Sequence, residues 1–550
     1  MKFTKKSKYA WLAMAVTASL MASGYSSVQA TNYSGNDQII WGAERYDKGV
    51  FGKAMTKDAD GTLVYDFGED VTFTQTKIAS PNSAIQNADV PSAVVIKSNT
   101  NVIMHSNGWS AIAVKAGLRE GMFDMPGDKR GTVTFDGNLS MRDTSVDGEW
   151  GVTAKNTHGG FSVYKGARWQ PVGLRAGEAG DIVVNGDLDL AVQGSALVTD
   201  PYYKALKTTG SKGYMDDYGL STITTYGDVR IDTPEDMTEA YYSIANYGGT
   251  INVNTDGTTA RDKNVIINGN ILTMHDTGKS NSGGDYFYRS GQTNLALTNN
   301  TSSWTGVVDN TGTDQAGEVN LWLQNNATWN HKALSSTDGI NLGGLPQQSA
   351  AQYGAYDGIS HINKLIGGNS EASSGLIFQN NKANIEIADY SGFTTVFYKH
   401  DNDGSSTSDY TAGDVIIKKA EKDSAIHLVT DSVKLDTKDG TKVNSVLNAL
   451  AGKLTYSDYA NHPDNLKGVV KIAAGLTSDS IILKTADIQF GEDGKGSYSK
   501  PPVTNFTTSL TGDSSTDTEY ANADVIQSDG TYKFIEDSSI NVNGEGAIGA

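Results

Sequence analysis

Few residues in this 550-residue chain have the types and spacing that catalysis requires. The sequence contains no cysteine, which excludes a cysteine nucleophile, and no Gly-x-Ser-x-Gly motif, which leaves one route to a serine hydrolase without support. The eight histidines lie at least 27 residues apart, so no two can form a metal-binding pair on one helix. We expect them in loops or in the core. They are His105, His158, His275, His331, His361, His400, His427 and His462.

The best candidate for a metal site is a group of aspartates. The segment Asp401-Asn-Asp-Gly404, with Asp409 behind it, has carboxylates at alternate positions and resembles half of a calcium loop. The bidentate glutamate that ends such a loop is absent, and an exposed turn explains the same residues. The sequence therefore predicts no metal and no other cofactor, and it leaves open whether Asp401, Asp403 and Asp409 bind calcium.

Acidic and basic residues also stand beside glycines that recur along the chain, namely Asp187, Asp228 and Arg230. Because paired carboxylates carry out glycoside hydrolysis, a carbohydrate-active β-helix enzyme, either a polysaccharide lyase or a hydrolase, is one hypothesis. Turn geometry explains acids at matching repeat positions better than catalysis does. No catalytic residue is therefore predicted.

The recurring glycines belong to a repeated unit, in which a Gly-Asn or Gly-Asp step separates two apolar alternations. Four copies stand out, at residues 132–141, 181–190, 222–231 and 264–273. Their central glycines are Gly137, Gly186, Gly227 and Gly269, which are 49, 41 and 42 residues apart. A partial copy occupies 413–417 and an imperfect one 539–544.

Each copy alternates apolar and polar residues, so Val133 shares a face with Phe135, and Leu139 with Met141. Glycine permits a turn or bulge where a side chain would clash, and the neighbouring Asn or Asp tolerates turn geometry. An Asn-Gly step also suits a hairpin, but a period of forty-odd residues favours stacked units, because each alone buries too little apolar surface. We therefore predict an all-β fold, a right-handed parallel β-helix with roughly two coils per period and protruding loops.

Two further segments have distinct patterns. In 318–329, Val319, Leu321 and Leu323 share one face, and Asn325-Asn326 then predicts a turn. Residues 441–454 instead carry apolar side chains at helical spacing, with Gly452 near the predicted helix end. Those side chains are Val443, Val446, Leu447, Leu450 and Leu454. We expect this helix to pack on the side of the solenoid, with strands resuming over 466–472 and 480–490.

The first thirty residues have the pattern of a secretory signal. Four lysines among the first eight residues precede an apolar run over 10–21, and Val28-Gln29-Ala30 offers small side chains to a signal peptidase. The run is shorter than the roughly 20 residues that a membrane-spanning helix needs. We therefore expect a signal peptide over 1–30 and a mature chain that begins near Thr31.

Composition narrows the possible partners. The formal net charge is −19, which repels nucleic acid and anionic lipid headgroups. Hydrophobic residues make up 38% of the chain, which argues against a disordered polyelectrolyte. The absence of cysteine in an exported chain suits one that must stay unfolded through a second export step, and it also suits a long solenoid that needs no disulfide.

Four features of the chain together resemble those of autotransporter passenger domains. They are the signal, the lack of cysteine, the Gly-Asn-[Leu/Ile] repeats and the region from Lys442 to Phe490. Segments 303–306 and 321–329 look like coils common in that family. Segments 446–454 and 468–476 are similar to large surface proteins of diderm Negativicutes. The resemblance extends over most of the chain in style and about fifty residues in motif.

This resemblance implies a β-helical passenger that is threaded unfolded through an outer-membrane β-barrel translocator, and is then displayed on the surface of a diderm bacterium or secreted. Expected partners are that barrel, in cis or separately encoded, and surface molecules or glycans of host or neighbouring cells, but no nucleic acid. The family ends in a barrel that these 550 residues do not contain, so we expect a fragment or a separately encoded barrel.

Three functional hypotheses follow. The first is a non-enzymatic adhesin or structural display stalk, the second is the carbohydrate-active enzyme, and the third is an envelope matrix protein without a barrel. The expected division is a signal peptide over 1–30, a solenoid passenger region over 31–440, and a truncated, helix-containing continuation over 441–550.

Overall fold

The computed structural model describes most of the repeated region of the chain and short stretches near its ends. The described residues are 31–35, 40–41, 55–75, 83–87, 93–104, 112–117, 131–143, 172–177, 180–192, 195–200, 221–232, 242–246, 248–276, 289–312, 317–332, 359–400, 410–435, 440–476, 480–498, 508–513, 525–527, 532–533 and 538–543. The chain divides into two compact units. The first comprises Met1–Asp236, Ser243–Ile267 and Lys279–Phe287, and the second comprises Met237–Tyr242, Asn268–Gly278 and Tyr288–Ala550.

The first unit has three faces, each a ladder of parallel strands. Face A contains β1 (Thr31–Gly35), β5 (Val71–Gln75), β8 (Thr100–Met104), β11 (Leu139–Asp143), β14 (Leu188–Ala191), β17 (Val229–Asp232) and β20 (Val265–Asn268). Face B contains β2 (Ile40–Trp41), β6 (Ser83–Asn87), β9 (Ile112–Ala116), β12 (Val172–Gly177), β15 (Leu197–Asp200) and β18 (Tyr242–Asn246). Face C contains β4 (Leu63–Tyr65), β7 (Ala93–Ile96), β10 (Gly131–Phe135), β13 (Gly180–Val184), β16 (Thr222–Thr225) and β19 (Gly249–Val253), and the short β3 (Met55–Lys57) pairs antiparallel with β4.

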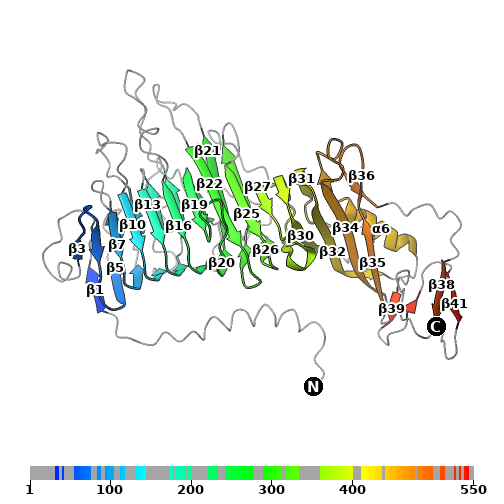
Figure 1. The fold of residues 1–550 in the computed structure, drawn as a ribbon, viewed down its shortest axis with the longest axis horizontal. Helices are drawn as coiled ribbons and strands as arrows, with labels where there is room; N and C mark the ends of the chain where they lie inside the picture. The colour runs from blue at the N-terminus through cyan, green and yellow to red at the C-terminus, as the bar shows by residue number, and fades with distance from the viewer. Residues whose placement is uncertain are drawn as a thin grey trace, which may run out of the picture. The chain divides into compact units, whose positions relative to one another are not determined.

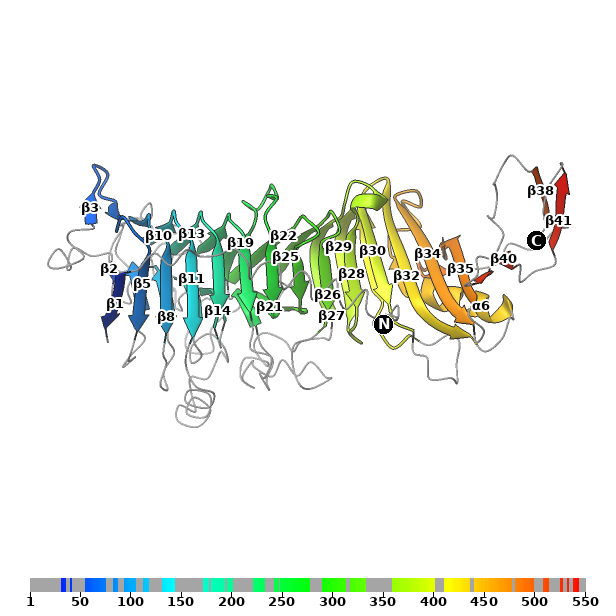
Figure 2. The ribbon, with the colours of Figure 1, turned by 90° about the horizontal axis from the view of Figure 1, so that it is seen from below.

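Along the chain, each coil of this unit visits face B, then face C, then face A. Strands β12, β13 and β14 make one coil, and β15, β16 and β17 make the next. Figure 1 shows β10, β13 and β16, the face C strands of successive coils, side by side. Figure 2 shows β5, β8, β11 and β14 side by side on face A. These contacts confirm the predicted all-β parallel β-helix, with strands pairing between coils rather than as hairpins.

The repeat period corresponds to one coil, and the expectation of two coils per period is wrong. Phe135 pairs with Val184 and Leu139 with Leu188, so positions 49 residues apart are direct neighbours. The reason is the length of the connections, because residues 144–171 separate β11 from β12 within one coil.

Alternate residues of each strand fill the interior. Val133, Phe135, Leu139 and Met141 are at most 1% exposed, as their spacing predicts. The next coil buries the matching residues Ile182, Val184, Leu188 and Leu190 to the same extent. Each such side chain stabilises the fold by about 1.5–3 kcal/mol relative to an exposed position.

The fourth copy of the repeat is displaced by one strand. Val265 pairs with Val229, so the strand before Gly269 lies on face A, where the earlier copies have the strand that follows their glycine. The strand that follows Thr222–Thr225 on face C is Gly249–Val253 instead. A ten-residue corner, 254–263, separates β19 from Asn264 and breaks the spacing of the repeat.

The second unit also begins with three ladders of parallel strands, which are lettered in the same way. Face A contains β23 (Ser303–Thr305), β26 (Thr328–His331), β28 (Gly375–Gln379), β30 (Phe393–Tyr398), β32 (Ser424–Leu435) and β34 (Leu466–Leu476). Face C contains β22 (Arg289–Leu297), β25 (Glu318–Leu323), β27 (Ile359–Ile366), β29 (Asn384–Ser391), β31 (Val415–Ala420) and β33 (Leu454–Tyr456). Face B contains β21 (Asn270–Asp276) and β24 (Val308–Gly312).

After β26 the described coils have two strands instead of three. Strand β27 is long enough for Ser360, near its start, to accept a hydrogen bond from the Val308 N–H in β24, while Lys364 pairs with Asn320 in β25. One strand therefore continues both face B and face C. Strands β27 and β29 then pair over their whole length, with Ile359 opposite Asn384 and Ile366 opposite Ser391.

Two stacked tryptophans fill the core where these faces meet. Trp304 and Trp329 are fully buried, and their rings are 4.8 Å apart and nearly parallel. The Nε1–H of Trp304 donates to the Gly269 carbonyl at 2.9 Å, and that of Trp329 donates to the Gly306 carbonyl at 3.0 Å. Each ring therefore stacks on its neighbour and also satisfies a buried carbonyl of the adjacent coil.

The segment around these tryptophans follows its predicted pattern. Val319, Leu321 and Leu323 are at most 1% exposed. Asn325 and Asn326 form the turn with φ of 54° and 64°, in the left-handed region that asparagine tolerates.

The predicted helix is present as α6 (Gly440–Ala451), and its buried side chains include Val446, Leu447 and Leu450. It is shorter than predicted, because Leu454 is buried in β33 and pairs with Val415. The coil resumes after the helix, with β33 and β34 parallel to β31 and β32. Both views show α6 beside β34 and β35 (Ser480–Asp487) in the second unit (Figures 1 and 2).

The remaining described elements are short. They are the 3-10 turn η3 (Glu371–Ser373) and the strands β36 (Gln489–Phe490), β37 (Gly496–Ser497), β38 (Thr508–Asp513), β39 (Val525–Gln527), β40 (Tyr532–Lys533) and β41 (Ser538–Asn543). Strand β35 pairs antiparallel with β34, and β41 pairs parallel with β38, so the last repeat-like segment does form a strand. The predicted signal over 1–30 lies outside the described residues, and the predicted boundary at residue 440 stays a prediction.

Candidate functional site: a polar groove on face A

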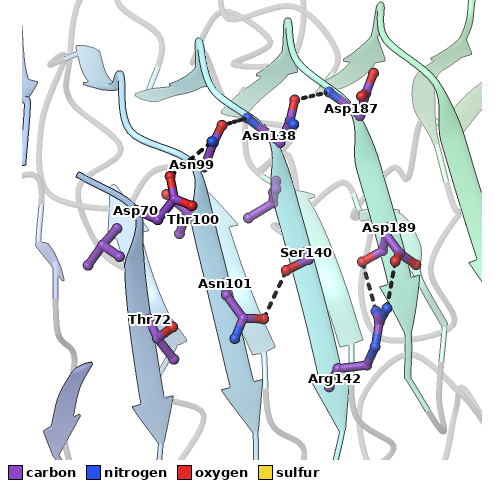
Figure 3. Close-up of a pocket in the computed structure, with 12 residues that line it drawn as sticks. Asp70, Thr72, Asn99, Thr100, Asn101, Asn138, Ser140, Arg142, Asp187 and Asp189 are labelled. Atoms are coloured by element: carbon purple, nitrogen blue, oxygen red, sulfur yellow. Dashed lines mark hydrogen bonds and ion pairs between the residues drawn. The ribbon is translucent and has the colours of Figure 1, made fainter. Parts of the chain in front are cut away.

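A column of Asn and Asp side chains runs along the corner between faces C and A of the first unit. We call it the Asx column, and its members are Asp70, Asn99, Asn138, Asp187, Asp228 and Asn264. From Asn99 to Asp228, each side-chain Oδ1 accepts the backbone N–H of the next member at 2.9 Å. Figure 3 shows this chain of hydrogen bonds from Asn99 to Asp187. The Asn or Asp of the repeat thus joins neighbouring coils, beyond tolerating a turn.

Three of the four repeat glycines, Gly137, Gly186 and Gly227, stack directly behind this column. A Cβ on Gly186 would lie 2.5 Å from the carbonyl of Gly137, and one on Gly227 would lie 2.3 Å from the oxygen of Gly186. None of the three has positive φ. Glycine is therefore required here by the close approach of successive coils and not by a turn conformation.

A groove of about 330 Å³ lies between the Asx column and a second row of polar side chains on face A. This outer row, Thr72, Asn101, Ser140 and Asp189, is in register across β5, β8, β11 and β14. The Ser140 hydroxyl donates to Asn101 Oδ1 at 2.8 Å. Both rows project outward from face A in Figure 3, because the residues between them point into the core.

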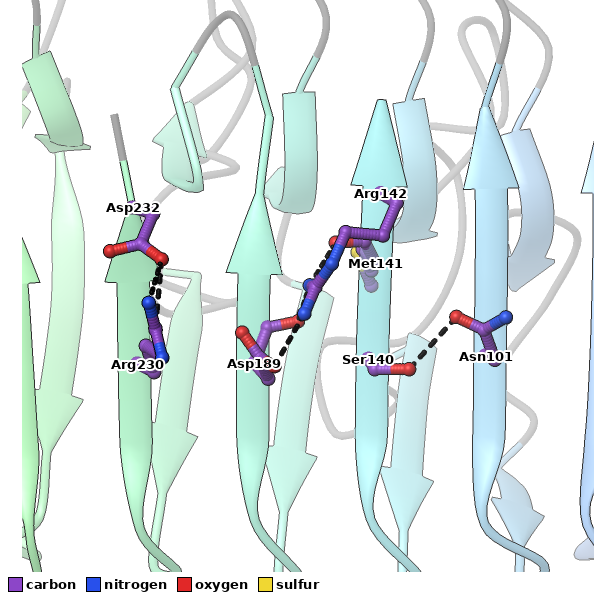
Figure 4. A network of polar contacts seen from close by, with 7 residues as sticks. All are labelled: Asn101, Ser140, Met141, Arg142, Asp189, Arg230 and Asp232. Atoms are coloured by element: carbon purple, nitrogen blue, oxygen red, sulfur yellow. Dashed lines mark hydrogen bonds and ion pairs between the residues drawn. The ribbon is translucent and has the colours of Figure 1, made fainter. Parts of the chain in front are cut away.

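An ion pair between β11 and β14 forms part of the groove lining. Arg142 Nη2 lies 2.5 Å from Asp189 Oδ2, and its Nη1 donates to the Met141 carbonyl at 2.8 Å. The second oxygen of Asp189, Oδ1, is buried without a hydrogen-bond partner among the described residues. On the next coil Arg230 pairs with Asp232 at 2.7 Å (Figure 4). These pairs are part-exposed, so each adds at most about 1 kcal/mol, but they neutralise both arginines.

Several groove atoms keep unused hydrogen-bonding capacity. The Nδ2 groups of Asn101 and Asn138 and the Oδ2 of Asp187 have no hydrogen-bond partner among the described residues. The lining contains three acids, Asp70, Asp187 and Asp189, against the single base Arg142, for a net charge of −2. The groove therefore offers neutral donors and a negatively charged acceptor on successive coils.

The three residues singled out for carbohydrate chemistry lie close together, but in different roles. Asp187 and Asp228 belong to the Asx column, where one oxygen of each accepts a backbone N–H. Arg230 lies in register with Asp189 on the outer face of β17 and is held by Asp232. Asn101, Ser140 and the outer row as a whole were missed by the sequence analysis, although they alternate with buried residues and align once the period equals one coil.

Three of the predicted loop or core histidines are buried, and two are paired with acids at the surface. His331 is fully buried, with Nδ1 2.5 Å from Gln379 Oε1 and Nε2 2.9 Å from Ser360 Oγ. Desolvation lowers the pKa of His331 to about 4. His400 and His427 are also buried, and burial lowers the pKa of His427. His361 and His462 lie beside Glu386 and Asp458, whereas His275 lies in β21.

No group of three or more metal-ligating side chains is present in the part of the chain that the structure describes. The segment 401–409, which resembles half of a calcium loop, lies outside the described residues, as do His105 and His158. Calcium binding by Asp401, Asp403 and Asp409 therefore stays open. Among the described helices, none is long and apolar enough to cross a membrane.

Comparison of the chain with protein-family models, with curated proteins and with solved structures gives no match.

Proposed function

We propose that this chain is an exported scaffold of the autotransporter-passenger type, which displays its loops and its groove at the cell surface as an adhesin or display stalk. The observation that carries the proposal is the coil-upon-coil pairing within each unit, achieved without any cysteine. A rigid ladder of this kind is suited to holding binding surfaces and needs no catalytic centre.

The pairing pattern supports export through a narrow pore. Each described coil of the first unit pairs only with the coil before it and the coil after it, as the register of β14 with β11 and β17 illustrates. In solenoids of this kind folding can nucleate at any unit and then propagate to its neighbours. A chain that emerges unfolded can therefore build its structure progressively on the far side of the membrane.

The length and composition of the connecting segments support a role in contact rather than in chemistry. Long chain segments connect β11 to β12 and β15 to β16, over 144–171 and 201–220. These segments and their neighbours are rich in Gly, Ser, Asp and Tyr. Weak contacts made by many such loops, on many copies of the chain, add up to strong attachment through multivalency.

Surface display is tested on intact cells of the source organism. An antibody against the chain is expected to label intact cells, and extracellular protease is expected to remove the label while a periplasmic marker stays intact. A chain lacking residues 2–30 is expected to remain inside the cell. Labelling that appears only after the cells are permeabilised would contradict the proposal.

The carbohydrate-active enzyme stays the second candidate, because the groove contains acids beside an arginine. The purified full chain would be incubated with polysaccharides, and new reducing or unsaturated ends would be measured. Turnover that disappears in Asp189→Asn, a variant of the same size, would replace the scaffold role with an enzymatic one.

A further inference from the structure

We propose that the groove on face A of the first unit binds a neutral, linear polysaccharide that lies across the strands and follows the ladder from β5 to β14. This inference rests on the proposed display role and gives its partner a chemical class. Binding is measured on the purified chain and display on cells, so either idea can fail without the other.

Several polar groups in the groove have unused hydrogen-bonding capacity. Along the ladder, the groove offers the Asn101 and Asn138 amides as donors, together with the free Asp187 oxygen as an acceptor. Thr72 adds a hydroxyl at the β5 end of the outer row. A sugar hydroxyl both donates and accepts, so a polyhydroxylated chain can satisfy both kinds of group in succession.

The polar side chains of the groove repeat from coil to coil. Coils of a parallel ladder follow each other at about 4.8 Å, a spacing similar to the length of one pyranose residue in an extended β-linked chain. Asn101 and Ser140 occupy the same outer-row position on neighbouring coils, as do Asn99 and Asn138 in the Asx column. A ligand with its own repeat can therefore make related contacts at each coil.

The net charge of the groove lining favours a neutral ligand. The lining carries a net −2, and both nearby arginines are already paired with aspartates. An anionic glycan, such as a uronate or a sulfated chain, would meet like charge and would find no unpaired arginine in the groove. Neutral sugars avoid this repulsion.

The floor of the groove favours a polysaccharide over an extended peptide. An extended peptide gains affinity mainly by pairing its backbone with an open strand edge. Strands β8 and β11, which form the floor of the groove, each pair with a strand on both sides, so their backbone groups are occupied. Recognition must come from side chains, which suits a ligand whose own polar groups are hydroxyls.

The test measures binding of the purified full chain to two hexasaccharides by calorimetry, one a neutral β-1,4-glucan and one a polyuronate. We expect the neutral hexasaccharide to bind and the polyuronate to bind at least tenfold more weakly. Ser140→Ala is expected to weaken binding roughly threefold and Asn101→Leu roughly tenfold, since each removes groove hydrogen bonds but no member of the Asx column.

The matched control is Thr134→Leu, which changes an outward residue of β10 on face C in the same coil. It is expected to leave binding unchanged. Unaltered melting of Ser140→Ala shows that its effect does not come from unfolding. The proposal is overturned if neither hexasaccharide binds, if the polyuronate binds more tightly, or if Ser140→Ala and Asn101→Leu bind as well as the parent chain.

Discussion

At the scale of single residues, the repeat glycines are constrained by the distance between coils. Gly186 lies so close to Gly137 that even one carbon would overlap the carbonyl below it. The neighbouring Asx side chains then replace, across the corner, the hydrogen bonds that a regular strand would make. A short Gly-Asx step in the sequence therefore encodes both the close approach and the bond that joins one coil to the next.

Replacing Gly186 with Ala should destabilise the first unit by about 1–3 kcal/mol, because the coils must separate locally to admit the methyl group. Urea unfolding, followed by circular dichroism, measures this change. Gly452→Ala is the control, because a Cβ there would meet its nearest atom at an ordinary 3.4 Å. Equal stability of the two variants would show that the close approach has no energetic consequence.

The buried imidazole of His331 should make stability depend on pH. Its pKa is lowered to about 4 in the folded chain, from 6.5 when exposed, because burial disfavours the charged ring. Between pH 4 and pH 6.5 the unfolded chain therefore binds a proton at His331 that the folded chain does not bind. The contribution of the neutral His331 to folding stability is complete above pH 6.5 and is lost as the pH falls toward 4. The loss is about 3 kcal/mol over that interval.

Urea midpoints measured at pH 7.5 and pH 4.5 test this expectation. The parent chain should lose stability between the two pH values, and His331→Gln, which cannot titrate, should lose less. If the two chains show the same pH dependence, other groups cause it and the role assigned to His331 is wrong.

At the scale of elements, the stacked tryptophans hold neighbouring coils of the second unit together through ring contact and through hydrogen bonds to Gly269 and Gly306. Replacing Trp329 with Ala should cost about 3–5 kcal/mol of stability, because it leaves a large cavity. Trp329→Phe keeps most of the contact and should cost about 1–2 kcal/mol, mainly for the unpaired Gly306 carbonyl.

Guanidinium unfolding of both variants measures the two costs. Their difference separates ring packing from the hydrogen bond. A Trp329→Ala midpoint equal to that of the parent would contradict the assignment of this pair to the core.

The same scale shows what the sequence could predict. Alternation of apolar residues predicted the strands around Gly137 and Gly186, and helical spacing predicted α6, because both signals are local. The number of coils per period and the displacement of the fourth copy depend on loop lengths and on which strand a segment meets, which no local pattern contains. The outer row was missed for the same reason, since Asn101 and Ser140 become neighbours only when the coil closes.

At the scale of the whole molecule, the absence of cysteine becomes a testable property of the proposed export route. Thr134 and Val183 are direct neighbours on adjacent coils of face C. Paired strands bring Cα atoms to a separation that permits a disulfide. A chain with Thr134→Cys and Val183→Cys should cross-link in an oxidising periplasm and stop before reaching the surface.

Display of this double variant should recover when cells grow with a thiol reductant, and each single-cysteine variant should be displayed normally. Surface labelling by antibody, together with the mobility of the chain on non-reducing gels, provides the measurement. Normal display of a fully oxidised double variant would mean that the chain does not need to be unfolded during export.

The Asx column also has a consequence for how such a chain can change in length. Each corner is bonded to the next by the same backbone and side-chain atoms, so the junction between two coils is alike from Asn99 to Asp228. A duplicated or deleted period would create a junction of the same kind, and the neighbouring strands would find equivalent partners. Gene duplication can therefore lengthen the first unit in whole coils, with the groove growing by one step each time.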